Sequence, residues 1–143
     1  MASFQNVLIN SMQINNKKIG PEADYFSNLN NGQLFIQHCD ACESHIFFPR
    51  IICPYCGSNE VSWVKPTGYG AVYSVSVIFG KPGVGTDYNV ALIDLEEGVR
   101  MMSRVEGVSP NLIQIGDKVK ARVLILNGKG LVVFDYKGGN GPE

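Results

Sequence analysis

The sequence has no surplus of charge of either sign and no long uninterrupted apolar run. Twelve lysine and arginine residues are balanced by thirteen aspartate and glutamate residues, which leaves a formal net charge of -1. A nearly neutral chain offers no overall field to attract nucleic acid or an anionic membrane. The longest uncharged stretches, 1–16 and 66–80, are interrupted by polar residues or glycine, so neither is expected to span a bilayer.

The sequence also lacks the local signatures of several catalytic classes. It contains no Gly-x-Ser-x-Gly elbow, no His-Glu-x-x-His pair and no Gly-x-x-x-x-Gly-Lys-[Ser/Thr] loop. The glycine-rich stretch 80–85 is not followed by a helical pattern, which favours a flexible strand connection over a phosphate-binding loop. The first residues show no basic and apolar pattern of a signal peptide, and we expect a cytoplasmic protein.

What the sequence does contain is two Cys-x-x-Cys pairs, Cys39 with Cys42 and Cys53 with Cys56. Each pair can direct two thiolates at one centre, and a short hairpin can bring the second pair opposite the first. The pattern predicts four-thiolate coordination of a structural Zn²⁺, with a rubredoxin-type iron centre as the alternative. Two disulfides would need an oxidising compartment, and a thioredoxin-like site usually has a single pair. Metal binding would leave no cysteine for nucleophilic catalysis.

The segment before the cysteines predicts one short helix. Residues 1–20 are polar and weakly patterned, and we expect them to form a flexible arm. In 21–33, Pro21 stands at an early helical position and Gly32 ends the pattern. The apolar residues of this helix fall three apart, at Ala23, Phe26 and Leu29.

The cysteine pairs lie between short strand patterns. Strands are expected at 34–37, 46–48 and 61–64, with the cysteine pairs in the turns. Residues 34–66 are therefore predicted to form a zinc ribbon, and the Pro66-Thr67-Gly68 sequence is a plausible boundary to the next domain.

Residues 67–137 have the alternating pattern of an all-β domain, followed by a tail at 138–143. Five strands are expected, at 70–79, 88–95, 99–105, 118–126 and 131–136. A short helical turn is expected between the third and fourth strands. This order is that of an OB-fold, here a five-stranded barrel, and the alternative is a generic five-stranded barrel or open sandwich.

These segments together resemble a known family, over about residues 21–136. The resemblance rests on the helix PEADYFSNLNNG, the stretch LFIQHCDACESHIFFPRIICPYCGS, and the strands GYGAVYSVSVIFG, YNVALIDLEEGVRMMSRVEG and IGDKVKARV. They are similar to the rubredoxin-like zinc-ribbon and OB-fold proteins associated with acyl-CoA metabolism. Members of that family are mostly accessory subunits of thiolase-superfamily enzymes, among them the small subunit of benzoylsuccinyl-CoA thiolase.

The resemblance implies a hetero-oligomer with a thiolase-like catalytic subunit and an acyl-CoA thioester as a possible ligand, including an aromatic one such as benzoylsuccinyl-CoA. It does not imply that this chain is the catalyst, because thiolase-type chemistry needs a free cysteine nucleophile. The alternative is a nucleic-acid-binding module, since ribbons and OB-folds both occur there, although the charge disfavours it. An iron-bearing electron carrier is a third option.

Coenzyme A presents phosphates and an adenine, so a site for it needs lysine or arginine near an aromatic or apolar surface. Strand alternation places Arg100 and Arg104 on one face of their strand, and Lys120 and Arg122 on one face of theirs. Together with Lys81 they are the candidate CoA-binding residues. The alternative is that this basic stripe is only the solvated side of the barrel.

Three residues beside the metal hairpin, Phe47, Phe48 and Arg50, form a candidate partner interface. Aromatic residues in ribbons also often pack onto a neighbouring domain, and this alternative stays open.

Overall fold

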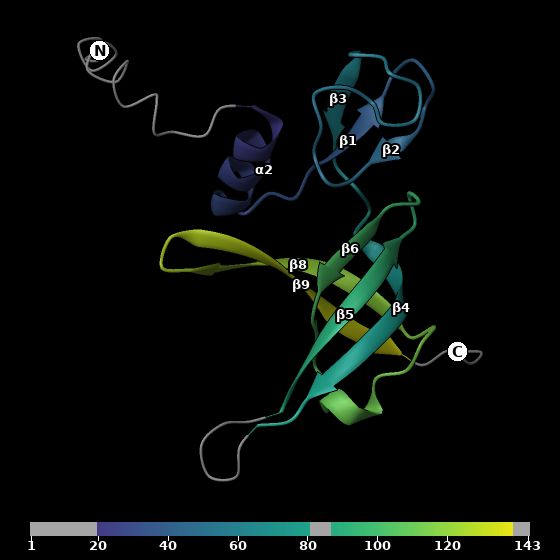
Figure 1. Ribbon diagram of the computed structural model, residues 1–143. Coiled ribbons are helices and arrows are strands. Elements are labelled where there is room, and N and C mark those ends of the chain that lie inside the picture. The colour runs from purple at the N-terminus through teal and green to yellow at the C-terminus, as the bar shows by residue number, and fades with distance from the viewer. Residues whose placement is uncertain (1–19, 81–86, 139–143) are drawn as a thin grey trace.

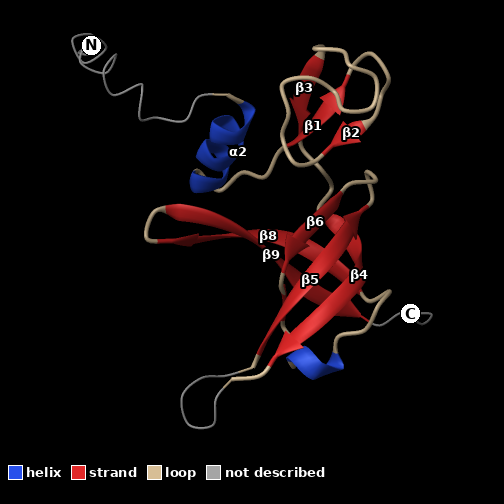
Figure 2. Ribbon diagram, in the orientation of Figure 1, coloured by secondary structure: helices blue, strands red, loops and turns tan. Residues whose placement is uncertain are grey.

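The structure is a computed structural model that describes residues 20–80 and 87–138. It contains one α-helix, a small three-stranded sheet and a larger six-stranded sheet (Figures 1 and 2). In chain order the elements are α2 (Pro21–Asn30), β1 (Ile36–Cys39), β2 (His45–Ile46), β3 (Val61–Val64), β4 (Tyr69–Ile78), β5 (Tyr88–Leu95), β6 (Arg100–Ser103), β7 (Val105–Glu106), the 3₁₀ helix η2 (Pro110–Leu112), β8 (Lys118–Leu126) and β9 (Lys129–Gly138).

The small sheet is the predicted ribbon. Its strand order is β2-β1-β3, and β1 pairs antiparallel with both neighbours. Figure 1 shows this sheet and α2 at one end of the larger sheet, while Figure 2 shows η2, the second blue helix, at the other end.

The larger sheet has the order β6-β5-β4-β8-β9-β7, and the predicted OB-fold is confirmed. One detail is corrected: the strand expected at 99–105 is broken at Arg104, so six strands replace five. The halves separate because β6 pairs antiparallel with β5, whereas β7 pairs in parallel with β9. The Arg104 carbonyl accepts a hydrogen bond from the Phe134 N–H at 2.9 Å. The two edges of the sheet are thus consecutive pieces of chain, joined at one residue.

The helix begins at Pro21 as expected, and the left-handed Gly32 follows its end (φ +84°). The predicted apolar face was partly wrong. The buried residues are Tyr25 and Leu29, one helical turn apart, while Phe26 is 42% exposed. Helical residues four apart share a face, and α2 turns this face toward β9 and the ribbon.

Helix, ribbon and barrel share a single hydrophobic core. Tyr25, Leu29 and Ile36 cluster with buried barrel residues that include the fully buried Phe134. A small second cluster surrounds the buried cysteines. The connection from ribbon to barrel is held at Thr67, whose N–H and hydroxyl donate hydrogen bonds, each 2.9 Å, to carboxylates of the β5–β6 turn. The domain boundaries expected at 33, 66 and 137 stay predictions.

In the described ranges, no helix combines the length and apolar character needed to cross a membrane.

Candidate metal centre and ligand-binding surfaces

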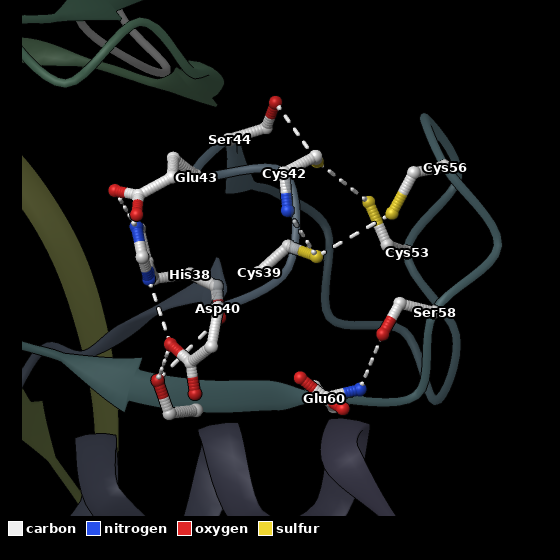
Figure 3. Close-up of polar contacts among 11 residues, drawn as sticks. His38, Cys39, Asp40, Cys42, Glu43, Ser44, Cys53, Cys56, Ser58 and Glu60 are labelled. Atoms are coloured by element: carbon white, nitrogen blue, oxygen red, sulfur yellow. Dashed lines mark hydrogen bonds and ion pairs between the residues drawn. The ribbon is translucent and has the colours of Figure 1, made fainter.

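The four cysteine sulfurs converge on one point between the two turns of the ribbon (Figure 3). All four lie within 4.8 Å of one another, with 3.6 Å between the sulfurs of Cys39 and Cys56 and 3.7 Å between those of Cys42 and Cys53. A tetrahedral zinc site with bonds of about 2.3 Å has sulfurs about 3.8 Å apart, whereas a disulfide brings them to about 2.05 Å. The sulfurs are therefore arranged as ligands of a tetrahedral metal, which fits structural Zn²⁺.

The two turns that carry the cysteines have the same backbone geometry. In the first, the N–H of Glu43 donates to the Cys39 carbonyl at 2.7 Å, and the Cys39 N–H donates to the Ser44 carbonyl at 2.8 Å. In the second, the equivalent residues Gly57, Cys53 and Ser58 repeat both bonds at 2.9 and 2.8 Å. Local hydrogen bonding of the chain thus directs each cysteine pair, and the hairpin brings the pairs together.

Each turn also donates backbone N–H groups to its buried sulfur. The Cys42 N–H lies 3.4 Å from the Cys39 sulfur, and the Tyr55 N–H lies 3.3 Å from the Cys53 sulfur. Such donors stabilise the thiolate form that a metal needs. A hydrogen bond with the Ser44 hydroxyl contributes most to lowering the pKa of the Cys42 thiol, to about 6. The pKa of Cys56 is instead raised to about 12, because a backbone hydrogen bond with Ser58, which lowers it, is outweighed by burial and by hydrogen bonds with the other three thiols. Cys39 and Cys53 are buried while Cys42 and Cys56 are exposed, so a metal held by the four sulfurs would lie close to the surface on one side.

His38 lies beside the centre but belongs to a separate polar group. Its Nδ1 lies 2.9 Å from a carboxylate oxygen of Asp40, and its Nε2 lies 3.8 Å from Glu43 (Figure 3). Hydrogen bonds from His38 and Ser62 lower the pKa of Asp40. The imidazole is thereby engaged with carboxylates, and the four sulfurs form the ligand set.

The arginines of the candidate CoA-binding set are paired with acidic residues. Arg100 Nε lies 2.6 Å from Asp94, and its guanidinium stacks 3.4 Å from the centre of the Tyr73 ring. The hydrogen bond to Asp94 is the main cause that raises the pKa of Arg100. This arginine therefore belongs to the β4–β5–β6 side of the barrel.

A second group lies on the β7–β8–β9 side. Arg104 pairs with Glu106 at 2.7 Å, and Arg122 pairs with both Glu106 and Asp135 at 2.9 Å. The structure thus brings Arg104 and Arg122 together at a shared carboxylate and separates them from Arg100. The sequence did not reveal this grouping of charges, because its members come from different strands: Glu106 lies in β7, Arg122 in β8 and Asp135 in β9.

The remaining two candidates differ from the arginines. Lys120 Nζ lies 4.7 Å from the centre of the Tyr69 ring, and the side chain lines a cleft beside the ribbon connection. Lys81 lies outside the described residues.

The candidate interface residues lie beside an apolar groove. The rings of Tyr25, Phe26, Phe47 and Phe48 form a cluster with centroid separations of 5.1 to 6.1 Å. Phe47 is half-buried in this packing, while Phe48 keeps 38% of its surface exposed. Burial raises the pKa of Tyr25 to about 12, so this phenol stays neutral.

The cluster forms one wall of a groove of about 290 Å³, and Met102 and Leu131 stand on the barrel side of it. We call this feature the apolar groove, lined by Tyr25, Phe26, Leu29, Phe47, Phe48, Met101, Met102, Gly130, Leu131 and Val132. Met102 is 71% exposed. Arg50 is exposed and is not part of the lining; Gln37 binds its backbone.

Sequence reasoning missed Phe26, Met102 and Leu131 as members of this surface. A signal was present for Met102, which alternation placed between two arginines on the outer face of its strand. An apolar residue at such a position is a candidate for contact with a partner.

Comparison with known proteins shows what this chain resembles. Residues 27–62 match the family model described as the ChsH2 rubredoxin-like zinc ribbon domain, and residues 63–124 match the ChsH2 C-terminal OB-fold domain. A solved structure titled Ltp2-ChsH2(DUF35) aldolase superposes with a TM-score of 0.72 at 34% identity, covering 81% of this chain and 94% of that one.

Two relatives illustrate the range of the similarity. A benzoylsuccinyl-CoA thiolase subunit, BbsA, from Thauera aromatica is 32% identical over 103 residues, which cover 69% of this chain and 70% of that protein. A probable enoyl-CoA hydratase alpha subunit from Thermomonospora curvata is 36% identical over 96 residues, 66% of this chain. This chain spans only 30% of the length of the Thermomonospora protein. The resemblance inferred from the sequence is confirmed, and the chain belongs to the DUF35 family of proteins that join a rubredoxin-like zinc ribbon to an OB-fold.

Proposed function

We propose that this chain is a non-catalytic accessory subunit of a thiolase-superfamily enzyme. In this role it binds the catalytic subunit and helps to bind or channel an acyl-CoA thioester. The observation that carries the proposal is the apolar groove, whose rim exposes Phe48, Met102 and Leu131 to solvent. Apolar and aromatic side chains gathered in a concave surface are typical of the central part of a protein interface.

The names of the relatives support the proposal that the partner of this chain is an enzyme. They include a thiolase subunit, a hydratase subunit and a chain of an aldolase. Two of these names specify CoA thioesters, which makes an acyl-CoA the first ligand to test, and benzoylsuccinyl-CoA the first aromatic one.

The metal centre supports a structural role for the ribbon within such a complex. Its four sulfurs face one another rather than an open cleft, so they are committed to a metal and not to a substrate. The zinc would fix the turns of the ribbon, and the ribbon in turn supplies Phe47 and Phe48 to the apolar groove. Arg50, adjacent to these residues, is proposed as a contact at the edge of the interface.

The test is to purify the tagged chain gently from its native cells and to identify stoichiometric partners by mass spectrometry. We expect a thiolase-superfamily subunit. Partner affinity is then measured for Phe48→Asp and Met102→Asp, because a charge in the centre of an apolar interface is strongly unfavourable. Each change should weaken binding by at least about tenfold.

The matched control is Leu112→Asp, in η2 at the opposite end of the barrel, where the side chain is 60% exposed. It should leave partner affinity unchanged, and zinc content should be equal in all variants. Unchanged affinity in both groove variants would refute the groove as the interface. Recovery of nucleic acid instead of a protein partner would favour the nucleic-acid-binding alternative.

A further inference from the structure

We propose that a cleft where the ribbon joins the barrel binds the phosphate groups of coenzyme A. This inference rests on the proposed function and assigns a location to its ligand. The cleft has a volume of about 210 Å³ and lies between the loop after α2, the connection from β3 to β4, and strand β8. We call it the linker cleft.

The linker cleft is lined by basic side chains. Its lining includes Lys65, Lys120 and Arg122 and contains no acidic residue. Within residues 20–80 and 87–138, no carboxylate lies within 4.0 Å of the ammonium group of Lys65 or Lys120. The arginines of the barrel, in contrast, are held by carboxylates. Two ammonium groups are therefore available to an anion, and lysine is a common point-charge ligand of phosphate.

A glycine keeps the space beside Lys120 open. Gly68 has φ +89°, and a Cβ at this position would lie 3.3 Å from Lys120 Cε and 3.5 Å from Ala121 Cβ. The Gly68 carbonyl accepts a hydrogen bond from the Ala121 N–H at 2.8 Å, which fixes the connection against β8. Any larger residue at position 68 would press on the lysine side chain that we assign to the phosphate.

The surroundings of the cleft suit a nucleotide phosphate better than a bare inorganic ion. Leu34 and Pro66 are buried in its lining and provide apolar surface. The Tyr69 ring, 50% exposed, does not line the cleft, but its centre lies 4.7 Å from the Lys120 ammonium and offers an aromatic surface next to this group. Adenine commonly uses such a ring for stacking.

The size of the linker cleft limits how much of the coenzyme it can hold. Pockets that enclose a whole drug-sized ligand are about 300 to 1,000 Å³. At about 210 Å³ the cleft admits the phosphorylated end only, and the acyl end extends out of it. This geometry matches a subunit that holds one end of a thioester while its partner does the chemistry on the other.

The cleft is also preorganised. The hydrogen bonds of Thr67 to Glu96 and Glu97 fix the connection that carries Lys65. A rigid site loses less conformational entropy when a ligand binds.

The experiment measures binding of coenzyme A and of adenosine 3′,5′-bisphosphate to the full-length zinc-loaded chain by calorimetry at physiological ionic strength. Lys65→Glu and Lys120→Glu should each weaken both ligands by about tenfold. The control is Lys129→Glu, which makes the same charge change at the exposed first residue of β9 and should have little effect. Inorganic diphosphate at equal ionic strength should bind more weakly than coenzyme A.

A second measurement does not depend on variants. Lysine acetylation by acetic anhydride, followed by mass spectrometry, should show that coenzyme A protects Lys65 and Lys120 but not Lys129. Equal loss of affinity in all three glutamate variants would overturn the proposal, as would equal binding of inorganic diphosphate or absence of lysine protection.

The experiments can refute the accessory role and the linker cleft independently of each other. If the catalytic partner binds normally but coenzyme A affinity is unchanged in Lys65→Glu and Lys120→Glu, the linker cleft is wrong and the accessory role stands. If no thiolase-like partner is recovered, the accessory role fails, while the calorimetry still tests the cleft.

Discussion

Asn89 and Val105 exchange two hydrogen bonds, both 2.9 Å long, between a buried side-chain amide and a backbone. The Asn89 Nδ2 group donates to the Val105 carbonyl, and the Val105 N–H donates to Asn89 Oδ1. The amide thus acts as a strand partner just beyond the break between β6 and β7. Gln37 does the same for the backbone of Arg50, at 2.6 and 2.9 Å.

Replacing Asn89 with alanine should destabilise the barrel strongly. The change leaves the N–H and the carbonyl of Val105 without partners in a buried environment, at about 1 to 3 kcal/mol for each group. We expect a loss of about 2 to 4 kcal/mol in the free energy of unfolding, measured by denaturant titration. The control Asn111→Ala, at an exposed position of η2, should change it by less than about 0.5 kcal/mol. A similar small effect of Asn89→Ala would show that the amide is dispensable.

The two metal-binding turns should respond oppositely to substitution at equivalent positions. Glu43 and Gly57 both have positive φ, at 66° and 83°, but only glycine adopts this conformation without strain. Gly57→Ala should therefore cost about 1 kcal/mol, whereas Glu43→Gly should be neutral or slightly stabilising. Thermal unfolding of zinc-loaded protein checks both. If Glu43→Gly destabilised as much as Gly57→Ala, strain at Glu43 would not be the explanation.

Removal of one ligand should remove the metal. Plasma mass spectrometry of the purified chain should find about one zinc per chain and no iron, and the protein should be colourless. Cys53→Ser should lose the zinc and unfold the ribbon, because ligand set and fold stabilise each other. Ser44→Ala, which removes only the hydroxyl next to Cys42, should keep the metal. Retention of zinc by Cys53→Ser would contradict four-thiolate coordination, and a red protein would indicate iron.

Gly130 is where the β8–β9 hairpin passes against α2. Its N–H donates to Asn30 Oδ1 at 2.8 Å, and a Cβ there would collide with the carbonyl of Leu29. Gly130→Ala should therefore weaken the docking of α2 by about 2 to 3 kcal/mol. Limited proteolysis should then cleave α2 faster.

Gly128→Ala is the matched control for this change. Gly128 also lies in the hairpin turn with φ +79°, but a Cβ there meets no atom within 4 Å. It should cost about 1 kcal/mol of strain and leave α2 protected. Equal proteolysis of the two variants would argue against the contact with Leu29.

Acid should weaken the pair of Arg122 and Asp135. The hydrogen bond from Arg122 holds the pKa of Asp135 below its ordinary value. A depressed folded-state pKa stabilises the protein above the unfolded pKa of about 3.9, and this stabilisation disappears as the pH falls through the folded value. Arg122→Gln should therefore be destabilising near pH 7 and much less so near pH 3, compared with wild type at each pH.

Comparison at equal pH also removes the effect of zinc loss in acid, which both proteins share. Glu60→Gln, at an exposed carboxylate that takes part in no ion pair among the described residues, is the control and should show no such pH-dependent difference. A constant effect of Arg122→Gln across this range would rule out the ionic contribution.

The metal centre and most strands were predictable because their signals are local. Cysteine spacing alone defines the two turns, and the Glu96-Glu97-Gly98 turn separates two strands with clear alternation. The strands expected at 61–64, 88–95 and 118–126 have the same bounds in the structure as β3, β5 and β8.

What the sequence did not reveal depends on contacts between distant segments. The pattern of residues 99–105 alternates without interruption, and only the parallel pairing of β7 with β9 shows the break at Arg104. The supposed basic stripe contains arginines neutralised by Asp94, Glu106 and Asp135. Lys65 falls within the predicted ribbon and was not among the candidate residues, and its place in one cleft with Lys120 follows from the folded arrangement alone.

The break at Arg104 also limits how another protein can recognise the barrel. The two strands beside the break are the edges of the six-stranded sheet, and both are short: β6 has four residues and β7 has two. Short edge strands offer few backbone groups to which a foreign strand can add. Recognition by β-augmentation at these two edges is thereby disfavoured. A partner that approaches them must instead read side chains, so point substitutions there should directly influence which subunit the chain selects.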